Sequence, residues 1–151
     1  MGTVIPRNES GPVTYEVVEA VKGGQVVEAR AAGKIGVAAL GSTTVLGVAS
    51  KDANTQANIT AATTGNTGLG FPFVDTSAGL VTPYVAVYDH ETVPVTFSGA
   101  VAFGKRVKAA ALGKVALWVS GTDAADLIIG TCVEPAGITA ADQVGLVRLG
   151  R

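Results

Sequence analysis

The residues best suited to chemistry lie together in one short segment. His90, the only histidine of the chain, stands between two carboxylic acids, Asp89 and Glu91. A histidine beside a carboxylate is the arrangement from which many hydrolases build a general base. In an extended segment, however, neighbouring side chains point to opposite faces, so both carboxylates would point away from the imidazole. A small enzyme working from these residues and Asp75 is an alternative that this spacing disfavours.

Other motifs with chemical potential are incomplete. With one histidine and one cysteine, the chain lacks the usual ligand sets for zinc. The segments Gly33-Lys34-Ile35 and Gly113-Lys114-Val115 lack both the upstream glycine and the following Ser or Thr of a phosphate-binding loop. Cys132 lies at the end of an apolar run, where a small buried side chain is expected. The sequence predicts no catalytic residue, no metal and no cofactor, and therefore a protein that is not an enzyme.

An internal repeat organises the chain. Residues 13–37 align with residues 93–117 without a gap, and nine of the 25 positions are identical. After a shift of three residues the pattern resumes, with Leu46-Gly47-Val48-Ala49 over Ile129-Gly130-Thr131-Cys132. We interpret this as two half-units, each consisting of a strand, a glycine turn, a Val-x-Ala strand, a Gly-Lys turn and further strands.

The residue pattern inside the repeat predicts strands. Apolar and charged residues tend to alternate in 25–30 and 106–109, which places one face on a core and the other in solvent. Glycines separate these runs, at positions where tight turns need a positive φ. We expect an all-β fold, either a compact β-barrel or a β-sandwich built from two pseudo-repeated half-units. Four side chains should face its core: Val27, Ala29, Val107 and Ala109.

The domain organisation follows from the repeat and from two segments that interrupt it. The length of 151 residues predicts one β domain, 13–151, with half-units at about 13–50 and 92–133. Residues 1–12 form an extended N-terminal arm, and 51–82 form a long polar central loop rich in Thr, Asn, Ala and Gly. These two segments contain apolar residues that we expect at an interface with a neighbouring subunit: Ile5, Leu69, Phe71, Phe73 and Val74.

Composition indicates a surface that other protein chains cover. Charged residues make up 15% of the chain, against about 25% in a typical protein, and the mean hydropathy is +0.41. No apolar run reaches the ~18 residues of a membrane span. A net charge of −1 with interspersed signs provides no basic stripe for nucleic acid. We expect a homo-oligomer, with no nucleic-acid or membrane partner. The single cysteine and the absence of a recognisable signal peptide predict synthesis in the cytosol.

The residue pattern and the spacing of its motifs resemble those of the small head decoration proteins, or capsid-stabilising proteins, of tailed bacteriophages. The resemblance covers roughly residues 13–149 and includes Tyr84-Val85-Ala86-Val87 and Cys132-Val133-Glu134-Pro135-Ala136-Gly137. It also includes the segments 46–49, 119–130 and 144–149. The family implies a β-rich subunit, commonly trimeric, made in the host cytoplasm. It implies a place on the capsid exterior of the virion, where the subunit reinforces junctions of the major capsid protein.

A carrier or ligand-binding module is the second alternative. Pseudo-symmetric β halves with Gly-Lys turns also suit domains that carry a lipoyl or biotin group on a lysine. The candidate attachment residues would be Lys34 and Lys114. The residues around both lysines lack the attachment context, which makes this alternative weaker than a structural virion protein.

Overall fold

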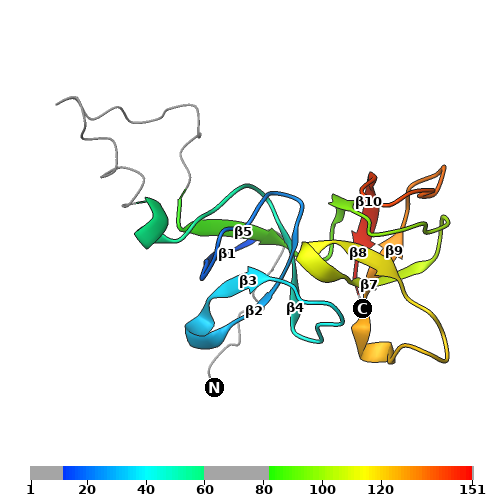
Figure 1. Ribbon diagram of the computed structural model, residues 1–151, viewed down its shortest axis with the longest axis horizontal. Coiled ribbons are helices and arrows are strands. Elements are labelled where there is room, and N and C mark those ends of the chain that lie inside the picture. Colours follow the sequence, from blue (N-terminus) through cyan, green and yellow to red (C-terminus); the bar gives the residue numbers. More distant parts are fainter. Residues whose placement is uncertain (1–11, 60–81, 151) are drawn as a thin grey trace, which may run out of the picture.

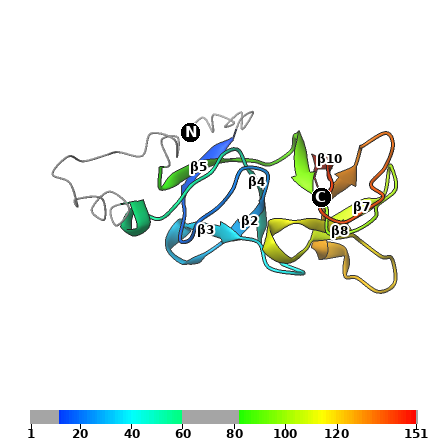
Figure 2. The same ribbon diagram turned by 45° about the horizontal axis from the view of Figure 1, so that its top comes forward.

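The protein is built almost entirely from β-strands. The computed structural model describes residues 12–59 and 82–150, and its strands form two five-stranded antiparallel sheets that lie side by side (Figure 1). Short 3-10 turns and one helical turn at 56–59 complete the described regular structure. The turned view shows the same arrangement of the two sheets (Figure 2). The predicted all-β class is confirmed, and two packed sheets are consistent with the sandwich form of that prediction.

The first sheet, drawn in blue to green in Figure 1, contains five strands in the order β1-β5-β4-β2-β3. Their bounds are β1 Val13–Glu16, β2 Val26–Ala29, β3 Ile35–Val37, β4 Val45–Ala49 and β5 Tyr84–Tyr88. The turn η1, Ala31–Gly33, joins β2 to β3.

The second sheet has five strands in the order β6-β10-β9-β7-β8. Their bounds are β6 Thr92–Thr96, β7 Arg106–Ala109, β8 Val115–Leu117, β9 Ile128–Cys132 and β10 Val144–Leu149. The turn η4, Ala111–Gly113, joins β7 to β8, and η5, Ala125–Leu127, precedes β9.

The two sheets repeat one topology, strand for strand. In sequence order the five strands of each unit pair in the same way, and an irregularity interrupts the register at Val27/Glu28 and again at Val107/Lys108. The predicted repeat is therefore structural. Each unit is longer than the predicted half-unit, because β5 closes the first sheet and β10 the second. The segment after β4 thus interrupts the first unit.

The turns η1 and η4 show the repeat at the level of the backbone. Ala32 and Gly33 have φ of 59° and 70°, and Leu112 and Gly113 have φ of 61° and 68°. Two consecutive residues in the left-handed region favour glycine at one of them, because only glycine adopts it without steric cost. This requirement explains why the Gly-Lys pairs recur in the sequence.

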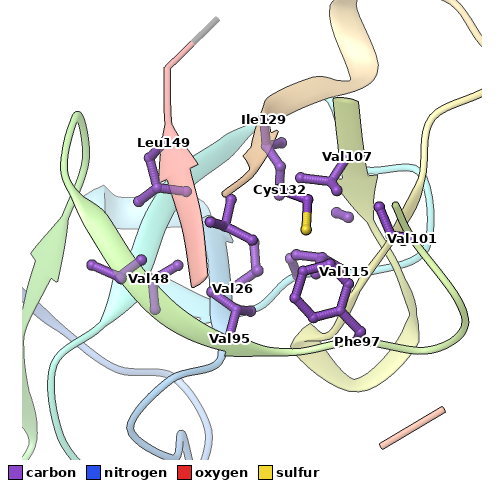
Figure 3. Packing of buried hydrophobic residues seen from close by; sticks show 14 of the residues in the cluster. Val26, Val48, Val95, Phe97, Val101, Val107, Val115, Ile129, Cys132 and Leu149 are labelled. Carbon is purple, nitrogen blue, oxygen red and sulfur yellow. The ribbon is translucent and has the colours of Figure 1, made fainter. Parts of the chain in front are cut away.

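The hydrophobic core is shared unequally between the units. One cluster lies within the first unit and includes Val27 and Ile35. The larger cluster fills the second unit, but it also contains Val26, Ala38 and Val48 of the first. Figure 3 shows Val26 and Val48 among side chains of the second unit. The outer face of the first sheet therefore packs into the core of the second unit.

The packing of the first unit on the second explains why the prediction for one core residue, Ala29, is wrong. Val27, Val107 and Ala109 are buried as expected, whereas Ala29 is exposed. The first unit lies over Ala109, where the Gly41 N–H donates to the Ala109 carbonyl at 3.1 Å. Among the described residues no second unit lies over Ala29 in the same way. The burial of an equivalent position thus depends on the neighbouring unit.

A glycine permits the close approach of the units. A Cβ added to Gly113 would lie 2.9 Å from Gln25 Cβ and 3.0 Å from Val37 Cγ1, both in the first unit. The equivalent Gly33 has nothing within 4 Å of such an atom. The Gln25 side chain also donates to the Leu112 carbonyl, at 3.0 Å. The η4 turn is therefore part of the junction between the units, while η1 lies in the open.

Candidate functional site

The interface residues predicted from the sequence cannot be placed. Ile5, Leu69, Phe71, Phe73 and Val74 all lie outside the described residues, so their role stays a prediction. Within 12–59 and 82–150, the junction of the two units is the candidate site.

A hollow of about 200 Å³ opens at this junction. The first unit lines it with part of β4 and with the linker between the units, and the second unit lines it with residues of β9 and β10. These lining residues are Val45, Leu46, Gly47, Asp89, His90, Ile129, Leu149 and Gly150. The hollow therefore depends on the docking of the units, and its wall mixes polar and apolar surface, with aliphatic side chains and glycines beside one acid and one imidazole. The sequence did not reveal it because its lining comes from four distant segments.

The Asp89–His90 pair in its wall differs from the predicted geometry. Residues 90 and 91 form a bend between β5 and β6, so the segment 89–91 is not part of a strand. The bend brings the Asp89 carboxylate into contact with His90 Nδ1, and the same carboxylate accepts the His90 backbone N–H at 2.6 Å. The expectation that the Asp89 carboxylate points away from the imidazole is wrong, because alternation of faces applies only to extended backbone.

Asp89 and His90 are the groups of this lining that could bind or react with a ligand. The lining of the hollow contains no serine, threonine or cysteine. Cys132 is buried within the core of the second unit. Across the part of the chain that the structure describes, no group of three or more His, Cys, Asp or Glu could hold a metal ion.

The two lysines considered for carrier attachment are held by ion pairs. Lys34 Nζ lies 2.7 Å from Glu16 Oε1, and Lys114 Nζ contacts Asp142 Oδ1. A carrier lysine must extend freely from its turn to present a prosthetic group. Both lysines instead hold the end of the turn against a neighbouring segment, which weighs against the carrier alternative.

Each unit fixes the loop after its third strand with a carboxylate, but the two carboxylates come from different places. In the first unit Glu28, on β2, accepts the Ala39 N–H at 3.0 Å. In the second unit the equivalent strand position is Lys108, which pairs at 2.5 Å with Asp123 of the loop itself. Asp123 then accepts the Val119 N–H at 2.8 Å. The sequence contains a signal for these contacts, because the equivalent residues Glu28 and Lys108 carry opposite charges.

The environments of both carboxylates stabilise their charged forms. Burial raises the pKa of Glu28, but hydrogen bonds from Ser42 and Ala39 and the charge of Arg30 outweigh it, so that the pKa lies below its usual value. The hydrogen bond from Lys108 is the largest cause of the lowered pKa of Asp123, and the Val119 N–H adds to it. These loops therefore contribute stability that depends on ionised carboxylates.

Apolar side chains are exposed beside the junction. Leu40 is 69% exposed and Leu112 is 70% exposed. Beside them, the Gly41 N–H donates to the Ala109 carbonyl and the Leu112 carbonyl accepts from the Gln25 side chain, and both hydrogen bonds link the units. Within the described residues, no helix is long and apolar enough to cross a membrane.

Comparison with known proteins identifies a similar fold. No protein-family model matches the sequence, and no curated protein matches it. Among solved structures, the fold is similar to the N base of head fiber gp8.5 in bacteriophage phi29, with a TM-score of 0.57. The two are 15% identical, and the match covers 91% of this chain and 92% of that chain. At this identity the likeness shows a shared fold across nearly the whole chain.

The loop carboxylates predict an acid-dependent loss of stability. The pKa values of Glu28 and Asp123 are lower in the folded protein than in the unfolded chain. Their ionised carboxylates therefore contribute fully to the stability of the fold at pH values above the unfolded pKa, about 4. This contribution is lost as the pH falls through the folded-state pKa values. We expect Asp123→Asn to reduce the decline of the thermal midpoint between about pH 5 and pH 2. Circular dichroism melts across this range measure it.

Asp126→Asn is the matched control, because Asp126 is exposed and lies in the same loop. This variant should retain the acid dependence of the wild type. An unchanged acid dependence in Asp123→Asn would contradict the assigned role of the Lys108–Asp123 pair.

Proposed function

We propose that this protein is a structural component of a bacteriophage virion. In this proposal it binds the outside of the capsid and reinforces the junctions between major capsid protein subunits, and it has no enzymatic activity. The single observation that carries the proposal is the fold shared with the N base of a phage head fiber, which extends over nine-tenths of both chains. The residue pattern of the sequence resembles that of head decoration proteins and supports the proposal independently.

The chemistry of the described surface agrees with a binding role. The junction exposes Leu40 and Leu112, and the lining of its hollow contains no hydroxyl or thiol side chain. Two units docked through a shared core form a platform whose surface features are fixed relative to one another. A modest contact repeated over a closed shell stabilises the whole assembly, because each bound site raises the effective concentration of the next. A capsid clamp needs such a platform and no reaction centre.

The test is attachment to assembled shells. We expect the purified protein to co-sediment with expanded shells of the major capsid protein from the same phage and to raise their thermal midpoint. Phe71→Ala combined with Phe73→Ala should lower the occupancy, because burial of each ring on a neighbour is worth about 1.5–3 kcal/mol. The melting midpoint of the free protein should stay unchanged.

Two results would contradict this account at different levels. Absence of the protein from the shell pellet would overturn the proposed function. Full occupancy by the double phenylalanine variant would overturn only the assignment of those two residues to the interface.

We also propose that the free protein is a homo-oligomer, with a trimer favoured by the family resemblance. The low content of charged residues and the positive mean hydropathy support association, because surplus apolar surface must be covered. Closed point-group symmetry would limit the assembly to a defined size. Sedimentation equilibrium at micromolar concentration should give three times the chain mass of 15.1 kDa. A single species of the chain mass at all concentrations would contradict the proposal.

A further inference from the structure

The hollow at the junction has the composition of a recognition site. Its wall is formed by aliphatic residues of both units, among them Ile129 and Leu149, which belong to the core of the second unit. A dry cavity of about 150 Å³ is enough to hold a benzene molecule. The hollow, at about 200 Å³, therefore has room for one large side chain of a partner.

The charge on the wall of the hollow determines which type of residue should stand next to that large side chain in the partner. The Asp89 side chain is 56% exposed, and in 12–59 and 82–150 its only ion-pair partner is His90. The other acids with close cationic partners, such as Glu28 and Asp123, are paired with arginine or lysine. A carboxylate that is more than half exposed beside the hollow favours an incoming lysine or arginine.

The repeat shows that this acid is a local feature of the first unit. Register pairs Val13 with Val87 and Val93 with Val147, so Asp89 is equivalent to Leu149. Both residues line the hollow, but Leu149 is 7% exposed and belongs to the core, whereas the Asp89 side chain is 56% exposed. The linker between the units therefore places a charge where the second unit has an aliphatic side chain.

We propose that the hollow binds a peptide segment of a partner protein that presents one large apolar side chain next to a basic residue. The apolar side chain enters between β4 and β9, and the basic group pairs with Asp89. This inference deepens the proposed function, because it specifies the kind of capsid segment that the protein would recognise.

The test uses the full chain and the dipeptide acetyl-Phe-Arg-amide as probe. We expect saturable amide shifts in nitrogen-15 NMR spectra at Gly47, His90 and Gly150, with a Kd on the order of 1 mM for so small a ligand. Asp89→Asn should weaken binding about two- to fivefold, the range of an exposed ion pair. It leaves an oxygen that can still accept the His90 N–H. Val45→Phe should fill the hollow and abolish the shifts.

The control peptide is acetyl-Phe-Glu-amide, which should bind more weakly. It is tested on the wild-type protein, so this comparison does not depend on whether a variant folds. Equal binding of the acidic peptide, or shifts that do not saturate, would overturn the proposal. Shifts of the same amides on simple dilution of the protein would assign the hollow to a second copy of the chain and would also overturn it. Shell attachment is measured separately, so the hollow can fail as a site while the proposed function stands.

Discussion

Two valine side chains on the outer face of the first sheet lie inside the core of the second unit, and the architecture depends on this contact. Val26 and Val48 are cross-strand neighbours, and both are fully buried. Burial of each is worth about 1.5–3 kcal/mol, a large part of a typical net stability of about 5–15 kcal/mol. Without this contact the hollow would lose one wall and the loop of Gly41 would lose its partner.

The contact also explains why two copies of one topology have unequal surroundings. Val93 is 5% exposed, whereas the equivalent Val13 is 47% exposed. On the outer face of the second sheet, Arg106 and Thr131 replace Val26 and Val48 at the same paired positions. In the first unit this outer face is apolar and packs against the second unit. In the second unit the same face is polar and meets solvent. A duplicated unit can in this way differ in its neighbours while it keeps its backbone.

The sequence predicted the features that depend on local chemistry. Alternation around Val107 and the positive φ of Gly33 and Gly113 are properties of single segments. The same alternation was wrong around Val27, because Val26 and Glu28 on the other face of that strand are also buried. The exposure of Ala29 and the lining of the hollow depend on which unit docks on which, and a sequence repeat contains no signal for that order. The bend at Asp89 was missed because a three-residue linker between two strands reads as extended backbone.

The proposed role in a virion rests on two units that are docked through a shared core, so their docking is the claim to test. Val26→Arg gives the first unit the side chain that the second unit has at the equivalent position, and Arg106→Val makes the reverse change on an exposed face. Calorimetry of both variants measures the consequence. A buried charge without a partner costs about 3–5 kcal/mol, so Val26→Arg should lower the thermal midpoint by roughly 10 °C or more, while Arg106→Val should change it little. Equal, small effects of the two substitutions would contradict the account, because they would show that the outer face of the first sheet is not part of the core.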